Sequence, residues 1–125
     1  LLKDLYKTEV YNLSNFRNTI SHVIRQNTID KEPSAELRPN QFDKDSLPEY
    51  DLLDKILRLY IEEDSSSEKI ISSGINENIV YDVLSKVDRN EYKRKQVAPG
   101  VKLTEKAFGK DRRMPITNTY IREQD

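Results

Sequence analysis

The segment that most constrains the fold is a long polar stretch, residues 33–50, which reads PSAELRPNQFDKDSLPEY. Three prolines interrupt it, and its few apolar residues follow neither the spacing of a helix nor that of a strand. Irregular segments longer than about 12–15 residues are uncommon in compact domains, and they are usually functional or disordered. The composition fits a solvated linker as well as a functional loop. The segment therefore supplies no core element, and its role has to be inferred from the rest of the chain.

The sequence before this stretch predicts a helical segment over about residues 5–24. Thr8 is a candidate N-cap, and Glu9 then lies in the first turn, where a carboxylate suits the helix dipole. A break near residues 18–21 would split the segment into two helices. The apolar positions recur at intervals of three and four: Val10, Leu13, Phe16, Ile20, Val23 and Ile24.

The sequence after the stretch predicts a second helix over about residues 48–61. Pro48 suits a first helical turn, where its missing N–H is no loss, and Ser46 with Glu49 forms a capping-box pattern. The apolar stripe of this helix is Leu52, Leu53, Ile56, Leu57, Tyr60 and Ile61.

Three further elements are expected before periodicity is lost. A short helix over about 67–73 ends at Gly74, and a longer helix begins at Asn76, a good N-cap. A charged helical run follows at 89–96, and residues 97–125 form an irregular, extended tail. The stripe of the longer helix is Ile79, Val80, Val83, Leu84 and Val87.

These elements predict a mainly α chain, with three to five helices, one long loop and an irregular tail. Three amphipathic helices bury little area alone, so we expect the stripes to need more protein to pack against. The chain also opens with Leu1 rather than Met, so we expect it to begin inside a longer protein. At 125 residues it is one domain or a piece of one.

The composition excludes several classes of function. A net charge of -1 favours neither nucleic acid nor an anionic membrane as a partner, and no apolar run reaches the length of a membrane span. The absence of Cys excludes a disulfide framework and thiol chemistry, and fits a reducing compartment. Three glycines are too few and too scattered for a phosphate-binding loop.

Catalytic and metal chemistry have little support in the sequence. His22 is the only histidine, which argues against a catalytic triad or a histidine-rich metal site, so no catalytic residue and no metal ligand is assigned. Carboxylates in and beside the long loop have the oxygen chemistry that Mg²⁺ prefers, but a solvated acidic surface is the alternative, and their spacing matches no calcium loop. They are Asp43, Asp45, Glu49 and Asp51.

Phosphate-binding chemistry has more support. Residues 88–96 place Tyr92 beside Lys93 and two further cations, a combination that suits phosphate oxygens and a stacked base or pyridine ring. The alternative is a solvated basic helix end, which the helix dipole also favours. Lys7 lies just before the expected helix start, where anions bind.

Three blocks in order resemble the C-terminal part of the synthetase domain of NAD⁺ synthetase. They are LLKDLYKTEVY, PSAELRPNQFDKDSLPEYDLLDKIL and DRNEYKRKQVAPGVKLTEKAFGKDRRMPI, and together they cover residues 1 to about 116. The tail after EYKRKQ is more similar to the glutamine-dependent long form than to the ammonia-dependent short form. The resemblance implies a piece of a Rossmann-like α/β domain of the adenine-nucleotide-hydrolase type, with residues 1–125 as the C-terminal portion of the amidating domain.

The resemblance implies a cytoplasmic ligase that makes NAD⁺. In that family ATP adenylates deamido-NAD⁺, pyrophosphate leaves, and ammonia from a glutaminase domain displaces AMP. The family's Ser-Gly-Gly-x-Asp-Ser loop and its main Mg²⁺ ligands are missing from this sequence, so we expect the chain to be inactive alone. Mg²⁺ would enter with ATP. The full protein is expected to be at least a homodimer, with part of the deamido-NAD⁺ site at the interface.

The resemblance also implies roles for individual residues. Lys7 and Ser34 match positions that contact ATP, and Tyr92 and Lys93 match a pair that contacts deamido-NAD⁺. Residues 33–50 match a loop that orders over the nucleotides and shields the intermediate from water.

Two more residues of that loop, Glu36 and Arg38, are expected to contribute further contacts. The alternative interpretation of the whole chain is a non-catalytic helical module that binds another protein through its apolar stripes.

Overall fold

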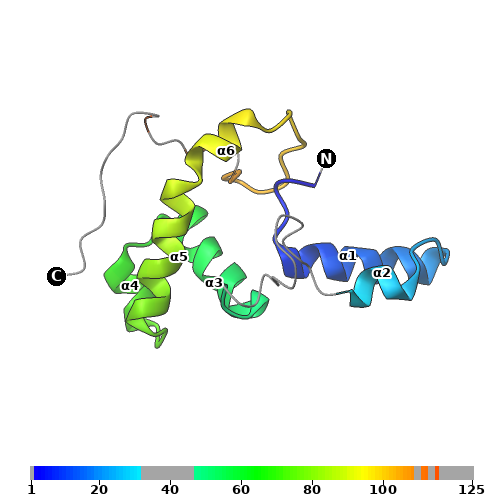
Figure 1. Ribbon diagram of the computed structural model, residues 1–125, viewed down its shortest axis with the longest axis horizontal. Coiled ribbons are helices and arrows are strands. Elements are labelled where there is room, and N and C mark those ends of the chain that lie inside the picture. The colour runs from blue at the N-terminus through cyan, green and yellow to red at the C-terminus, as the bar shows by residue number, and fades with distance from the viewer. Residues whose placement is uncertain (1, 32–46, 109–110, 113–114, 116–125) are drawn as a thin grey trace, which may run out of the picture. The chain divides into compact units, whose positions relative to one another are not determined.

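The computed structural model describes residues 2–31, 47–108, 111–112 and 115. Within these ranges the chain forms six α-helices and no strand (Figure 1), which confirms the mainly α prediction and adds one helix to the expected number. The helices are α1 (Lys7–Ile20), α2 (Gln26–Asp30), α3 (Tyr50–Ile61), α4 (Ser67–Ser72), α5 (Glu77–Arg89) and α6 (Glu91–Gln96). In the part of the chain so described, no helix combines the length and the apolar character needed to cross a membrane.

The chain divides into two compact units. Residues 5–54 form the first unit, and residues 1–4 together with 55–125 form the second unit. The first unit therefore contains α1, α2 and the first turn of α3. The second unit contains the rest of α3 and the three later helices, and it unites both ends of the sequence.

In the first unit, the side chain of Asn18 ends α1 and shapes the turn into α2. Its Oδ1 accepts hydrogen bonds from the backbone N–H groups of Val23 (3.2 Å) and Ile24 (3.0 Å), and its Nδ2 donates to the carbonyl oxygen of Ile24 (2.8 Å). The helix stops at Ile20, so the predicted break near residues 18–21 is confirmed, but the prediction that the helical segment continues to residue 24 was wrong. The sequence did not predict α2, which is only five residues long.

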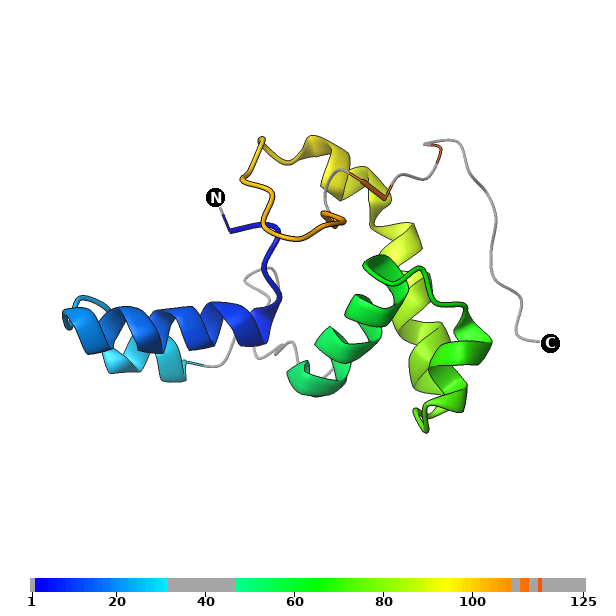
Figure 2. The same ribbon diagram turned by 180° about the vertical axis from the view of Figure 1, so that it is seen from behind.

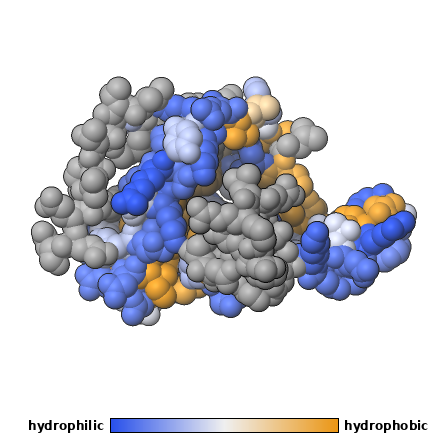
Figure 3. Space-filling model, in the orientation of Figure 1, coloured by the Kyte–Doolittle hydropathy of each residue, from blue (hydrophilic) through white to orange (hydrophobic). Residues whose placement is uncertain are grey.

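The apolar stripe of α1 is not buried in this structure. No residue of α1 is buried, and Leu13, Phe16 and Ile20 are 45%, 62% and 68% exposed. Apolar surface is visible on the part formed by α1 and α2 in Figure 3. For α1 this exposure agrees with the expectation that the stripes need more protein to pack against, whereas the stripe of α5 is largely buried within the chain.

The core lies in the second unit, where α4 packs along α5 beside the end of α3 (Figures 1 and 2). The stripe predicted for α5 is confirmed at four of its five positions, since only Ile79 is not buried. Apolar burial of this kind supplies about 25 cal/mol for each Å² removed from water. The buried apolar side chains of this unit are Ile56, Tyr60, Ile61, Ile70, Ile75, Val80, Val83, Leu84, Val87 and Ala107.

Local signals set the helix ends in this unit. Asn76 is the N-cap of α5 as predicted, because its side chain accepts from the backbone N–H of Asn78 (2.9 Å). Gly74 follows α4 with φ +90°, a conformation that favours glycine, so it ends this helix as predicted. The prediction for α3 was wrong by two residues: the helix begins at Tyr50, and Pro48 precedes it. Ser46, its predicted cap, lies outside the described residues.

A segment without regular structure, residues 97–108, follows α6, and we call it the tail segment. The carboxylate of Asp4 binds it by accepting the backbone N–H groups of Leu103 (2.6 Å), Thr104 (2.8 Å) and Phe108 (3.3 Å). It also accepts the hydroxyl of Thr104 at 3.1 Å. Asp4 is only 6% exposed. In both ribbon views the start of the chain runs beside this segment (Figures 1 and 2).

Lys3 adds a second contact to the same segment. Its Nζ donates a hydrogen bond to the carbonyl oxygen of Ala98 (3.1 Å), and its side chain crosses Gly100 so closely that a Cβ there would lie 2.8 Å from the Lys3 Cγ. The sequence predicted an irregular tail, but it gave no sign that residues 3 and 4 bind it. Polar contacts across about 100 positions therefore join residues 3 and 4 to the tail segment.

Acid should release the tail segment. Burial raises the pKa of Asp4, but the hydrogen bonds from Leu103, Thr104 and Phe108 together lower it by more than burial raises it. The pKa of Asp4 therefore lies below its ordinary value of 3.8. A depressed folded-state pKa gives stability that is complete above the unfolded pKa of about 3.9 and is lost as the pH falls through the folded value. Amide exchange at Thr104, corrected for its intrinsic rate, should therefore accelerate only below about pH 4.

An amide in place of the carboxylate should remove this dependence. We expect Asp4→Asn to give fast exchange at Leu103 and Thr104 at neutral pH, because the amide carries no charge for the N–H groups to bind. Asp82→Asn, which removes an exposed carboxylate paired with Lys86, is the matched control and should leave exchange at these amides unchanged. Full protection in the Asp4→Asn protein at neutral pH would contradict this account.

Candidate functional site

Tyr92 and Lys93 lie together on α6, a helix of six residues. Tyr92 is 52% exposed, Lys93 is exposed, and the Lys93 Nζ lies 5.9 Å from the centroid of the Tyr92 ring. Asn90 separates α6 from α5 and serves as the C-cap of one and the N-cap of the other. The charged run predicted as a helix over 89–96 therefore starts a new helix at Glu91, two residues later than expected.

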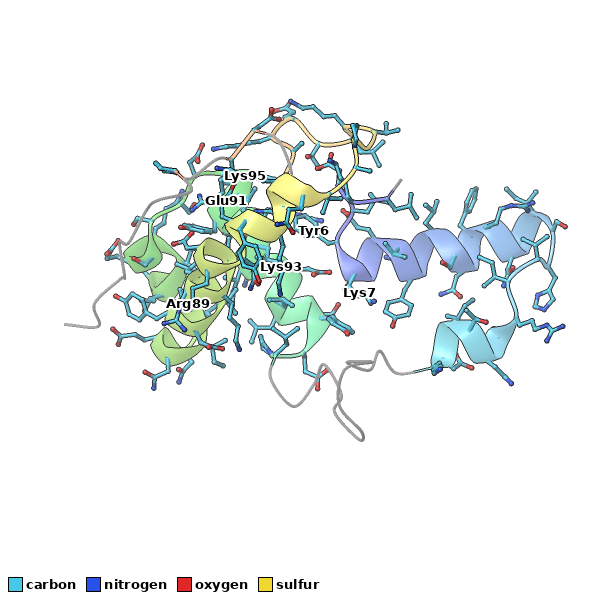
Figure 4. All side chains as sticks on the ribbon, turned by 45° about the horizontal axis from the view of Figure 1, so that its top comes forward. Tyr6, Lys7, Arg89, Glu91, Lys93 and Lys95 are labelled. Carbon is cyan, nitrogen blue, oxygen red and sulfur yellow. The ribbon has the colours of Figure 1, made fainter. Side chains whose placement is uncertain are left out.

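On the opposite side of α6, Glu91 and Arg94 form a largely buried ion pair within the helix (Figure 4 labels Glu91). The Glu91 Oε2 accepts from Nη2 of Arg94 at 2.6 Å and from its Nε at 3.1 Å. Arg94 Nη2 also donates to the carbonyl oxygen of Val87 on α5 (2.8 Å), and its guanidinium carbon lies 4.7 Å from the ring centroid of Phe108. One side chain thus contacts α5, α6 and the tail segment.

Two more cations, Arg89 and Lys95, lie near the Tyr92–Lys93 pair in the sequence (Figure 4). Arg89 is exposed in the last turn of α5 and Lys95 belongs to α6. Cations with an aromatic ring among them suit a ligand that carries both phosphate and a flat ring system. The chemistry inferred from the sequence for residues 88–96 is therefore available on the surface.

Lys7 lies in the first unit, at the first position of α1. Its Nζ lies 6.0 Å from the ring centroid of Tyr11 and 5.8 Å from that of Tyr50, and the two centroids are 6.4 Å apart. These distances are at the outer limit of cation–π contact. The lysine ammonium therefore lies near two aromatic rings at a helix N-terminus, where unbonded N–H groups favour anions.

The prediction that Thr8 is the N-cap of α1 was wrong, because that position belongs to Tyr6. The backbone N–H of Thr8 (2.9 Å) and its hydroxyl (2.7 Å) both donate to Oδ2 of Asp54, a buried residue of α3. Asp54 therefore binds the start of α1 from a residue 46 positions away, and no local pattern could have indicated it. Glu9 lies in the first turn as predicted and accepts from the backbone N–H of Tyr6 (3.0 Å).

The candidate residues of the loop at 33–50 cannot be placed relative to Lys7 or to the Tyr92–Lys93 pair. Ser34, Glu36 and Arg38, with most of the loop at 33–50, lie outside the described residues. Tyr92 and Lys93 belong to the second unit, and Lys7 belongs to the first unit.

The described residues do not assemble a metal site. Among them no three His, Cys, Asp or Glu side chains lie close enough to hold a metal ion. Asp51 is exposed on α3, His22 is exposed between α1 and α2, and Asp43 and Asp45 are not described.

The exposed Tyr92–Lys93 pair lies on a helical scaffold, and a cation beside an aromatic ring suits a ligand that carries an anionic group and a flat ring. Comparison with known proteins identifies the family of the chain. Residues 1–97 match the model of the NAD synthase family, and the chain belongs to this family. Its helices are part of an NAD synthase domain, which is of the adenine-nucleotide-hydrolase-like type.

The relatives are glutamine-dependent NAD⁺ synthetases. The chain is 53% identical over 121 residues to the one from Aquifex aeolicus, and the match covers 97% of this chain and 21% of that relative. It is 52% identical over 122 residues to the one from Acinetobacter baylyi, with 96% of this chain and 23% of the relative covered. The chain thus spans about a fifth of the length of these relatives.

A solved structure has the same fold over this part. It is the glutamine-dependent NAD⁺ synthetase from Acinetobacter baumannii in complex with ADP, with a TM-score of 0.56 and 43% sequence identity. The match covers 93% of this chain and 20% of that one. The resemblance noted in the sequence is therefore confirmed, whereas the roles of individual residues stay predictions.

Removal of the Thr8 hydroxyl should loosen the start of α1. Thr8→Val keeps the side-chain shape but leaves the buried Asp54 carboxylate with one donor fewer, at a cost of about 1–3 kcal/mol. Amide exchange in the first turn of α1 should accelerate about tenfold or more. Thr8→Ser keeps the hydroxyl and is the matched control. Equal exchange rates in the two variants would show that this hydrogen bond contributes nothing.

Proposed function

We propose that this chain is the C-terminal, nucleotide-binding part of a glutamine-dependent NAD⁺ synthetase. The full enzyme would adenylate deamido-NAD⁺ with ATP and replace AMP with ammonia drawn from glutamine, giving NAD⁺, AMP and pyrophosphate. The observation that carries the proposal is the exposed Tyr92–Lys93 pair on α6, whose other side carries the largely buried Glu91–Arg94 ion pair. The chain that contains it is about half identical in sequence to such synthetases.

The residues of α6 fit the binding of deamido-NAD⁺. The Lys93 ammonium is a compact cation that binds phosphate or carboxylate oxygens, and the exposed Tyr92 ring offers a face for a flat heterocycle. Binding at fixed groups orients the nicotinate carboxylate toward ATP, which lowers the entropic cost of the reaction.

The first unit fits the binding of ATP. Lys7 is proposed to contact ATP from the start of α1, where the bonds from Thr8 to Asp54 fix the backbone. Ser34 is proposed as a second ATP contact, with Glu36 and Arg38 as further contacts from the loop at 33–50. A polar loop that covers both nucleotides would exclude water from the adenylated carboxylate, which hydrolysis would otherwise destroy.

Several requirements of this reaction would be met outside the chain. Mg²⁺ bound to ATP would offset the charge that develops on the phosphates, and a glutaminase domain would supply ammonia. The full protein is proposed to be a cytoplasmic homo-oligomer, at least a dimer. The chain alone is proposed to be inactive, because it has no Ser-Gly-Gly-x-Asp-Ser loop to bind pyrophosphate.

A second candidate function rests on the exposed stripe of α1. Leu13, Phe16 and Ile20 would suit a helical module that binds a partner protein without catalysis. The two candidates differ in what the parent polypeptide contains. The enzyme requires a Ser-Gly-Gly-x-Asp-Ser loop ahead of Leu1 in that polypeptide, and its absence there would overturn the enzymatic proposal.

Loss of the Lys93 charge should selectively weaken deamido-NAD⁺ use. In a full-length protein that contains this sequence, Lys93→Ala should lower kcat/KM for deamido-NAD⁺ about 10–150-fold, because a hydrogen bond to a charged group contributes about 1.5–3 kcal/mol. The KM for ATP should change little. Steady-state kinetics with each substrate varied in turn measure both.

Lys69→Ala is the control for this experiment, since Lys69 is an exposed lysine on α4. It should leave the kinetic constants unchanged. Wild-type values of kcat/KM for deamido-NAD⁺ in the Lys93→Ala enzyme would remove Lys93 from the site.

A further inference from the structure

The direction of Lys93 cannot come from α6 alone. Isolated helices shorter than about 12–15 residues are marginal in water, and α6 has six. Its orientation therefore depends on its contacts with the rest of the second unit. The longest-reaching of the contacts described for it come from Arg94, whose guanidinium Glu91 binds within the helix.

The Glu91–Arg94 pair contributes more to the orientation of α6 than to the stability of the fold. The two side chains are only 7% and 12% exposed, and a buried ion pair often stabilises a fold no better than apolar residues of the same size. The planar guanidinium can satisfy several fixed acceptors at once. Here it binds the Glu91 carboxylate and the Val87 carbonyl, and it faces the Phe108 ring.

The helical repeat converts this anchoring into a direction for Lys93. Successive residues of an α-helix are rotated by about 100°, so Glu91 and Arg94 lie about 60° apart on one side. Tyr92 and Lys93 occupy the remaining side, in agreement with their exposure. A rotation or shift of α6 about its anchored side would move the Lys93 ammonium with the helix.

We propose that the Glu91–Arg94 ion pair is a positioning element that orients Lys93 toward deamido-NAD⁺. This inference rests on the proposed role of Lys93 as a deamido-NAD⁺ ligand. Arg94 itself is a positioning residue and not a ligand, because its side chain is only 12% exposed and its guanidinium is already bound to Glu91 and Val87.

A double-mutant cycle in a full-length protein that contains this sequence tests the proposal. The variants are Arg94→Met, Lys93→Ala and the combination, assayed with deamido-NAD⁺, ATP and glutamine. Arg94→Met should raise the KM for deamido-NAD⁺ about tenfold or more, since small displacements of a binding group have large kinetic effects. In the Lys93→Ala background the same substitution should have almost no further effect, because Arg94 acts through Lys93.

Arg112→Met is the matched control. Arg112 is also a nearly buried arginine (16% exposed), stacked 3.8 Å from the Tyr60 ring centroid and bonded to Asp88, but its described contacts do not include α6. It should lower the thermal midpoint by an amount comparable to Arg94→Met and leave the KM for deamido-NAD⁺ unchanged. Arg94→Lys keeps the charge without the fork, and its KM should lie between those of the wild-type and Arg94→Met proteins.

The outcomes separate this inference from the proposed function. If Lys93→Ala raises KM and Arg94→Met raises it equally in both backgrounds, the positioning role is overturned and the role of Lys93 stands. An equal rise of KM in Arg112→Met would also overturn it, as a general consequence of destabilisation. If Lys93→Ala leaves the kinetics unchanged, the proposed deamido-NAD⁺ site fails, and the positioning role fails with it.

Discussion

The second unit depends on one buried carboxylate. Asp4 accepts three backbone N–H groups and a hydroxyl from the tail segment, and these donors lie 99 to 104 positions away in the sequence. The tail segment has no helix or strand to pair its own N–H groups, and buried N–H groups without a partner are costly. A single charged acceptor meets that need and closes the unit into one body.

The same interaction extends to the candidate site. Phe108 donates its backbone N–H to Asp4 and places its ring against Arg94, which in turn binds Glu91 and the end of α5. Asp4 is thus linked to α6 through two residues, and α6 presents Tyr92 and Lys93. Polar contacts therefore help to fix the position of the helix that carries the predicted ligands.

Membership in the NAD synthase family puts these features in context. The chain spans about a fifth of the length of its relatives, so a site that binds two nucleotides would be completed by parts that are not in it. The exposed stripe of α1 agrees with this, because apolar side chains at Leu13 and Phe16 are unfavourable in water. The proposed ATP and deamido-NAD⁺ contacts fall in separate compact units, each with its own polar anchoring: Asp54 for the start of α1, and Arg94 for α6.

The sequence by itself determined the helical class, the end of α4 and the start of α5, because capping, glycine and periodic apolar signals are local. The family followed from the resemblance of three sequence blocks to NAD⁺ synthetase, which the family match confirms. Asn76 and Gly74 act on the next few residues, and the stripe from Val80 to Val87 needs only helical spacing to be recognised. The tertiary structure alone decided that Asp54 and not a local cap binds Thr8, that Asp4 binds the tail segment, and that Arg94 anchors α6. These are contacts of single polar side chains, two of them across long stretches of chain, and a charged residue has the same appearance in a sequence whether it is buried against a partner or solvated.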